Sequence, residues 1–120
     1  MTVTGPDFIS LQVRDLQRSA DFYEQQLGLT RTPAAPPGAV VFTTTPAFAV
    51  RETTPGVDLD ADGARPGLGV ALWLACDDAQ QLHDSMAAAG VTITVPPFDG
   101  PFGRTFTFTD PDGYAVTVHD

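Results

Sequence analysis

Apolar and polar residues alternate in short segments of the chain, and two longer segments carry apolar residues at helical spacing. The segment Phe8–Val13 alternates with a period of two, which predicts a strand with one buried face. Residues 16–27 predict a helix, because Asp15 is a typical N-cap and Gly28 is a typical residue just past a helix end. The apolar stripe of this helix consists of Leu16, Ala20, Tyr23 and Leu27.

The same order of elements recurs in the second half. Residues 70–76 predict a strand, Asp78 an N-cap, residues 79–89 a helix, and Gly90 its end. Three more strands are predicted after each helix, over 30–32, 40–44 and 48–51 in the first half and over 92–95, 104–109 and 114–119 in the second. We align Phe48–Arg51 with Tyr114–Thr117. The repeat predicts an α+β fold of two tandem βαβββ units over about 6–52 and 68–120, joined by a connector over about 53–67.

Composition and charge narrow the class of protein. A length of 120 residues suits a single domain over 1–120. The net charge of -9, with six arginines and no lysine, makes nucleic acid and anionic membrane surfaces poor partners. No apolar run is long enough to span a membrane, and the first residues lack the features of a signal peptide, so we expect a cytoplasmic protein. The single cysteine, Cys76, excludes an internal disulfide.

Two motifs near the ends of the chain carry a family resemblance. Val13-Arg14-Asp15-Leu16, followed by Ser19–Tyr23 and Leu27-Gly28-Leu29, resembles the opening signature of the vicinal oxygen chelate superfamily, and Phe108–Tyr114 resembles its other hallmark. That superfamily contains glyoxalase I, the bleomycin-resistance proteins and the extradiol dioxygenases. The resemblance implies that the two units form a curved mixed sheet with a concave crevice, and that the protein works as a homodimer.

The resemblance also implies where a divalent metal would be held in the enzymes of the superfamily. Residue by residue, those positions are Phe8, Arg51, Ala71 (Val70 if the register shifts by one) and Thr117. None of these side chains offers an imidazole, carboxylate or thiolate donor, and Arg51 would place a positive charge where the cation should sit. We therefore expect no metal, no cofactor and no catalytic residue.

Strand alternation predicts which side chains line the crevice instead. Ile9, Leu11 and Val13 should pack beneath the first helix, and the corresponding alternate residues of 70–76 beneath the second. The predicted ligand-binding residues are Phe8, Ser10, Gln12, Phe42, Arg51, Trp73, Phe98, Phe102, Arg104, Thr117 and His119. This mixture of aromatic and sparse polar groups is typical of a small-molecule pocket.

Three of these assignments have alternatives. Trp73 can stack on a planar guest or simply fill the core. Residues 96–103, rich in proline and glycine, read as a stiff loop that either forms a wall with Phe98 and Phe102 or serves as a rigid crossover. Arg104 can anchor an acidic group of a ligand or pair with a surface carboxylate.

Three functions fit these observations. The first is a non-catalytic protein that sequesters an aromatic natural product or antibiotic, like the bleomycin-resistance branch of the superfamily. The second is a glyoxalase-like or dioxygenase-like enzyme that uses a metal or an acid–base pair, for which Arg51 and His119 are the only weak candidates. The third is a partner or regulatory subunit without a ligand. The expected absence of metal ligands favours the first.

Overall fold

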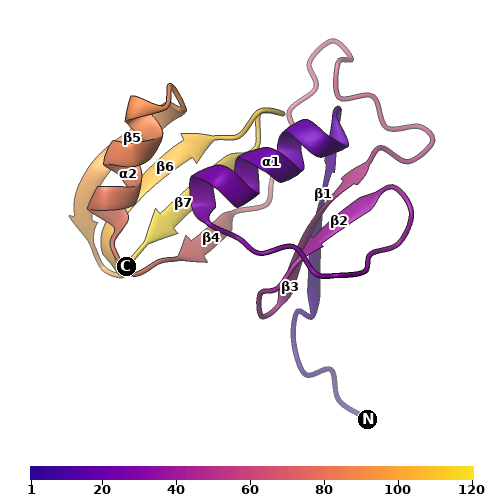
Figure 1. Cartoon of the computed structure of the whole chain (residues 1–120), viewed down its shortest axis with the longest axis horizontal. Helices are drawn as coiled ribbons and strands as arrows, with labels where there is room; N and C mark the ends of the chain where they lie inside the picture. The colour runs from indigo at the N-terminus through magenta and orange to yellow at the C-terminus, as the bar shows by residue number, and fades with distance from the viewer. The chain divides into compact units, whose positions relative to one another are not determined.

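Each of the two predicted repeats folds around one mixed sheet and one helix. The computed structural model describes all 120 residues and divides into unit 1, Met1–Asp60, and unit 2, Ala61–Asp120 (Figure 1). The predicted α+β class is confirmed, with a three-stranded sheet in unit 1 and a four-stranded sheet in unit 2. Neither helix is long and apolar enough to cross a membrane.

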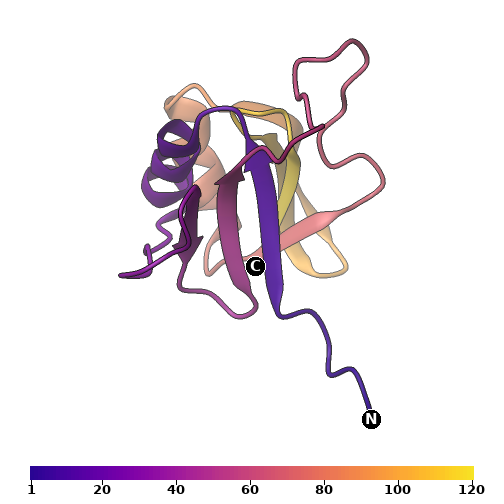
Figure 2. The same cartoon turned by 90° about the vertical axis from the view of Figure 1, so that its right-hand side faces the viewer.

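Unit 1 contains β1 (Phe8–Val13), α1 (Leu16–Leu27), β2 (Ala39–Phe42) and β3 (Ala47–Glu52). The strands lie side by side in the order β1-β3-β2, as Figure 2 shows, with β1 parallel and β2 antiparallel to the central β3. Burial along β1 follows the predicted alternation, since Phe8 and Ser10 are exposed while Ile9 and Val13 are at least partly buried.

Both predicted ends of α1 are confirmed. The Asp15 side chain accepts a hydrogen bond from the Arg18 amide at 3.1 Å, and Gly28 takes the left-handed conformation with φ of 71°. Tyr23 of α1 packs against two strand residues, with ring centroids 6.4 Å from Phe42 and 5.1 Å from Phe48. These three buried rings form the core between α1 and its sheet.

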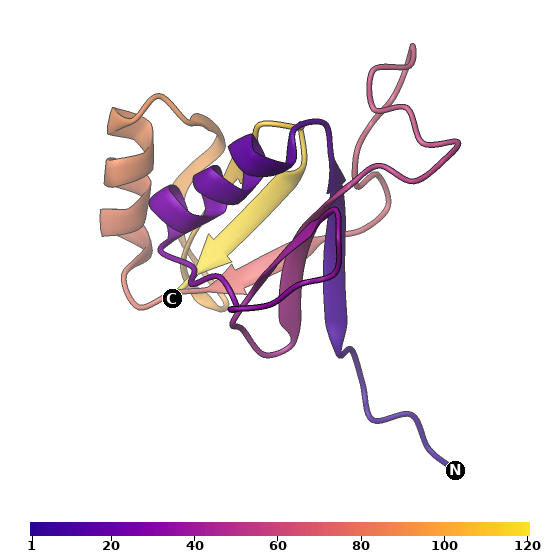
Figure 3. The ribbon, with the colours of Figure 1, turned by 45° about the vertical axis from the view of Figure 1, so that its right-hand side comes forward.

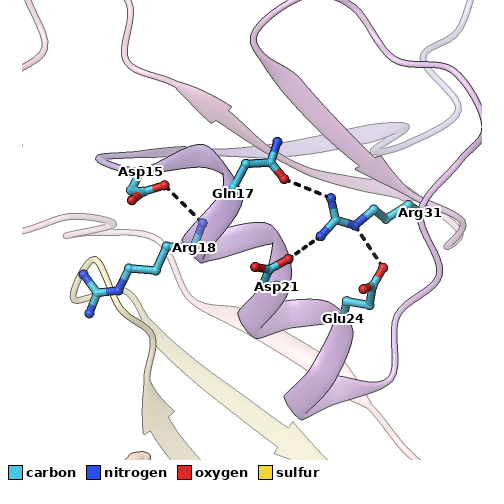
Figure 4. A network of polar contacts seen from close by, with 6 residues as sticks. All are labelled: Asp15, Gln17, Arg18, Asp21, Glu24 and Arg31. Atoms are coloured by element: carbon cyan, nitrogen blue, oxygen red, sulfur yellow. Dashed lines mark hydrogen bonds and ion pairs between the residues drawn. The ribbon is translucent and has the colours of Figure 1, made fainter.

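The strand predicted over 30–32 shrinks to a single bridge between Arg31 and Phe42. Prolines at positions 33, 36 and 37 prevent it from extending, because proline cannot donate to a strand ladder. The Arg31 guanidinium instead binds the exposed side of α1 (Figure 4). It contacts Asp21 at 2.7 Å, Glu24 at 2.9 Å and Gln17 at 3.2 Å.

The connector leaves β3 as an irregular loop (Figure 3) and is tied to unit 1 at two places. The Gln12 side-chain oxygen accepts hydrogen bonds from the amide of Thr54 at 2.8 Å and from its hydroxyl at 3.2 Å. The Arg14 guanidinium donates to the Asp60 carboxylate and to the Leu59 carbonyl, both at 2.6 Å. These contacts hold the connector against the end of β1.

Unit 2 has the complete βαβββ order. Its elements are β4 (Leu72–Ala75), α2 (Ala79–Ala88), β5 (Thr92–Gly100), β6 (Gly103–Thr109) and β7 (Ala115–His119). The strand order is β4-β7-β6-β5, with β4 parallel to β7 and the other pairs antiparallel. Figure 1 shows α2 beside β5 and β6, the strands that it contacts most extensively.

Asp78 caps the start of α2 as predicted, accepting a hydrogen bond from the Gln81 amide at 3.0 Å. Gly90, with φ of 84°, follows the end of the helix. A tight turn joins β6 to β7. The Gly113 amide donates to the Asp110 carbonyl at 3.1 Å, and the Asp110 side chain accepts from the amides of Asp112 and Tyr114.

The prediction of a stiff loop over 96–103 is wrong. Strand β5 continues to Gly100, and Gly100 pairs with Gly103, so that only Pro101 and Phe102 form the turn. Two register shifts interrupt the ladder around Val95 and Phe98. Prolines are tolerated here because β5 is an edge strand and carries these irregularities.

Strand β4 is shorter than the predicted segment 70–76. Val70, expected to pack beneath the helix, is 78% exposed and precedes the strand. Leu72 and Leu74 are partly buried and alternate with exposed Trp73 and Ala75, as predicted.

Candidate functional site

The sheet of unit 2 has one face packed on α2 and one face turned away from it. The helix side carries the buried rings of Phe106 and Phe108, and His83 of α2 contacts Phe106 edge to face at 5.4 Å between centroids. Strand pairing places Trp73 beside Thr117, and Thr117 beside Thr107. These three residues alternate with the helix-facing ones, so their side chains share the opposite face.

An aromatic cluster of Trp73, Phe102 and His119 lies on this face of unit 2, away from α2. The Trp73 and Phe102 rings meet edge to face with centroids 5.8 Å apart, and His119 lies 6.0 Å from Trp73 and 6.2 Å from Phe102. Trp73 is 47% exposed and Phe102 is 64% exposed. The interpretation of Trp73 as a core residue is therefore wrong, because nearly half of its side chain is open to solvent.

His119 is tied to the turn that carries Phe102. Its Nδ1 atom lies 3.1 Å from the backbone oxygen of Phe102. A carbonyl oxygen can only accept a hydrogen bond, so Nδ1 is the donor. This bond joins the end of β7 to the β5–β6 turn and keeps the three rings of the cluster together.

A row of threonines supplies polar groups beside the cluster. The hydroxyls of Thr107 and Thr117 are hydrogen-bonded at 2.8 Å. One of the two must donate to the other, which leaves the second hydroxyl hydrogen free to donate elsewhere. Thr107 was not among the predicted site residues, although its alternation with Phe106 and Phe108 is a readable signal.

Phe98 lies on the same face of unit 2 and is 45% exposed. It pairs with Thr105, whose neighbour on the other side is His119. Five predicted residues of unit 2 therefore share one face, listed here in chain order as Trp73, Phe98, Phe102, Thr117 and His119. Ala71 is exposed and lies just before β4.

Four of the predicted residues of unit 1, all except Phe42, also share a strand face. Pairing sets Ser10 opposite Ala49 and Gln12 opposite Arg51, and Phe8 precedes them on the same side of β1. Phe8 is 55% exposed. Arg51 is exposed and its Nε donates to the Glu52 carbonyl at 3.0 Å, but it forms no ion pair.

Two predicted site residues need correction. Phe42 is fully buried in the core of unit 1 against Tyr23 and Phe48, because strand pairing sets it opposite Phe48 on the helix side. Arg104 lies on the α2 side of its sheet, where it contacts Gln80 and Asp99, each at 3.1 Å. Neither side chain lies on the face of its own sheet that is turned away from the helix of its unit.

Strand pairing also corrects the alignment of the two repeats. Ser10 stands five residues before the capping Asp15, and Trp73 stands five before Asp78. Ser10 pairs with Ala49 and Trp73 pairs with Thr117. Thr117 therefore corresponds to Ala49, and His119 rather than Thr117 corresponds to Arg51.

The positions that the resemblance assigns to a metal do not fit one. With the corrected alignment these positions are Phe8, Ala49, Ala71 and Thr117. Only Thr117 has a side-chain oxygen that could bind a metal, and this hydroxyl is hydrogen-bonded to Thr107. No three His, Cys, Asp or Glu side chains gather as a metal site would require. Burial raises the pKa of the Cys76 thiol, which disfavours the thiolate form.

Comparison with known proteins agrees with this architecture. No curated protein matches the chain. TnmS3, an antibiotic binding protein from Streptomyces sp. CB03234, has a solved structure that matches with a TM-score of 0.75 and 22% identity over 99% of this chain and 97% of that one. A protein of unknown function from Agrobacterium tumefaciens matches with a TM-score of 0.74 and 26% identity, over 98% and 92% of the two chains.

The fosfomycin resistance protein FosX from Mesorhizobium loti is similar as well, with a TM-score of 0.69 and 19% identity over 98% of this chain and 92% of that one. These likenesses extend over nearly the whole chain, as the two motifs at its ends predict. The model of one family matches residues 5–118. The chain thus belongs to the Glyoxalase/Bleomycin resistance protein/Dioxygenase superfamily.

Proposed function

We propose that the protein binds an aromatic natural product or antibiotic and sequesters it without chemical turnover. The observation that carries this proposal is the exposed cluster of Trp73, Phe102 and His119 on the α2-free face of unit 2. A sheet face that leaves two large aromatic side chains half open to water gains free energy when a planar guest covers them.

The polar groups near the cluster suit orientation of a ligand better than catalysis. The Thr107–Thr117 hydroxyl pair and the His119 ring provide hydrogen-bonding atoms, but no nucleophile stands beside a base. The donor set at the metal positions of the superfamily also gives no support for Lewis-acid chemistry. Sparse polar groups around an apolar surface are the usual composition of a binding pocket.

The net charge of the chain favours some classes of aromatic ligand over others. A net charge of -9 raises the local concentration of cations and lowers that of anions near the surface, so neutral or cationic aromatic compounds are favoured. Solved structures of similar fold include proteins described as antibiotic binding and as fosfomycin resistance proteins, which supports a role in drug binding or resistance.

The proposal extends to assembly as a homodimer, with Phe8, Ser10, Gln12 and Arg51 of unit 1 also serving in ligand binding. Light scattering coupled to size-exclusion chromatography tests the assembly. A mass of twice the chain supports the homodimer, and a monomeric mass at all concentrations contradicts it.

Equilibrium dialysis against a panel of aromatic antibiotics, followed by mass spectrometry of the recovered compounds, tests the function itself. The proposal expects saturable, stoichiometric binding of at least one compound, which is recovered unchanged. Recovery of a converted compound would contradict it in favour of the enzyme alternative. Absence of binding to every compound would favour the partner-subunit alternative.

A further inference from the structure

The hydrogen bond between His119 and Phe102 fixes the chemistry of the opposite edge of the imidazole ring. Because Nδ1 donates to the Phe102 carbonyl at 3.1 Å, the proton of the neutral ring lies on Nδ1. Nε2 then carries a lone pair and is a hydrogen-bond acceptor. The tautomer is thus set by the backbone of the β5–β6 turn.

This acceptor is available to a ligand. Nε2 of His119 has no hydrogen-bond partner within the chain. No buried side-chain nitrogen or oxygen in the structure lacks a partner, so the unpartnered Nε2 must be open to solvent. It lies within the aromatic cluster, since the His119 ring is 6.0 Å from the indole of Trp73.

We infer that His119 selects aromatic ligands that carry a phenolic hydroxyl, by accepting its proton in a hydrogen bond at Nε2. This inference rests on the proposed function and names the ligand class of that same site. A ring stacked against Trp73 presents its substituents at its edge, where a hydroxyl meets an acceptor on the neighbouring imidazole. A methoxy group at the same position offers no proton and leaves Nε2 without a partner.

The experiment compares two simple probes, 2-naphthol and 2-methoxynaphthalene, by equilibrium dialysis. The ratio of their Kd values is measured for the wild-type protein and for two variants. His119→Phe keeps an aromatic ring but removes both nitrogens. His119→Asn keeps an amide N–H near the position of Nδ1, which can still donate to the Phe102 carbonyl, but has no acceptor in place of Nε2.

We expect both variants to change the ratio of the two Kd values by about fivefold against 2-naphthol, the size of one neutral hydrogen bond. An unchanged ratio in both variants overturns the inference. If the wild-type protein binds both probes and the binding depends on Trp73, that result leaves the proposed function intact. If neither probe binds to the wild-type protein, the inference is overturned, and the proposed function is decided by the antibiotic panel.

Discussion

The indole ring of Trp73 and the phenyl ring of Phe102 meet edge to face with centroids 5.8 Å apart. Trp73 belongs to β4, whereas Phe102 reaches it from the turn between β5 and β6, at the other side of the same sheet. The contact restrains the indole although nearly half of it is exposed. A restrained, exposed aromatic ring loses little conformational entropy when a ligand stacks on it.

Replacement of Trp73 by alanine is expected to weaken the binding of aromatic ligands by about 1–3 kcal/mol, the range of a stacking anchor. The unfolding temperature should change little, because the side chain is half exposed. Equilibrium dialysis and thermal denaturation by circular dichroism measure the two effects. Leu68→Ala is the matched control, since Leu68 is also exposed and apolar but has no ring contact. Unchanged affinity together with a collapse of stability would show that the site is misplaced.

Replacement of Phe102 by alanine removes its ring but leaves the backbone carbonyl that binds His119. We expect a loss of about 0.5–1.5 kcal/mol in ligand affinity, the scale of one aromatic pair, and a shift of Trp73 emission to longer wavelength as the indole gains contact with water. Fluorescence spectra of the free variant and dialysis with the ligand check these results. An unshifted emission spectrum would mean that Phe102 does not pack on Trp73 in solution.

The two arginines of the predicted site should behave differently. Arg51→Ala is expected to change selectivity among ligands with acceptor or anionic groups, because its guanidinium is exposed and forms no ion pair. Arg104→Ala should leave every affinity unchanged, because Arg104 lies on the α2 side with Gln80 and Asp99. Affinities for a neutral and an anionic aromatic ligand, measured on both variants, check this contrast. An equal effect of Arg51→Ala on all ligands would argue against a specific contact.

Asp120 makes the stability of unit 2 sensitive to acid. Backbone amides of Ala79 and Arg104 donate to its carboxylate, each at 3.0 Å, and hold the pKa of Asp120 below its usual value. A carboxyl group whose pKa is lower in the folded than in the unfolded state stabilises the protein at pH values above its unfolded-state pKa. This contribution disappears as the pH falls through the folded-state pKa.

The variant Asp120→Ala should therefore lower the unfolding temperature at neutral pH, and the difference from the wild-type protein should shrink as the solution is acidified below the ordinary aspartate pKa. Thermal scans over this pH range provide the measurement. Asp77→Ala is a suitable control, because the Asp77 side chain makes no hydrogen bond. A difference that stays constant down to the most acidic solution would contradict the assigned role of Asp120.

Local sequence signals predicted the parts of the fold that depend on neighbouring residues. Asp15, Asp78 and Gly28 act at helix ends through contacts within a few residues, so their roles can be read from the chain. Alternation within one strand placed Trp73 on the face opposite to the helix but left open whether its side chain fills the core. Arg104 could have been assigned correctly from the same rule, since it alternates in phase with Phe106 and Phe108.

Features that depend on strand pairing could not be predicted in this way. The position of Phe42 is set by its pairing with Phe48, and the correspondence of His119 with Arg51 by the register of β7 against β4. Pro96 and Pro97 predict a loop when only their neighbours in the sequence are considered. Strand β5 nevertheless continues through them, because an edge strand tolerates proline. The bond between His119 and the Phe102 carbonyl depends on the same hairpin and was not predicted.

Metal-independent binding of an aromatic ligand at Trp73 can be measured by a fluorescence titration. Trp73 is the only tryptophan, so its emission reports on a single place in the molecule. The titration is run with a panel of aromatic antibiotics, with and without EDTA. We expect saturable quenching that EDTA does not change. Quenching abolished by EDTA, or no response to any compound of the panel, would contradict it.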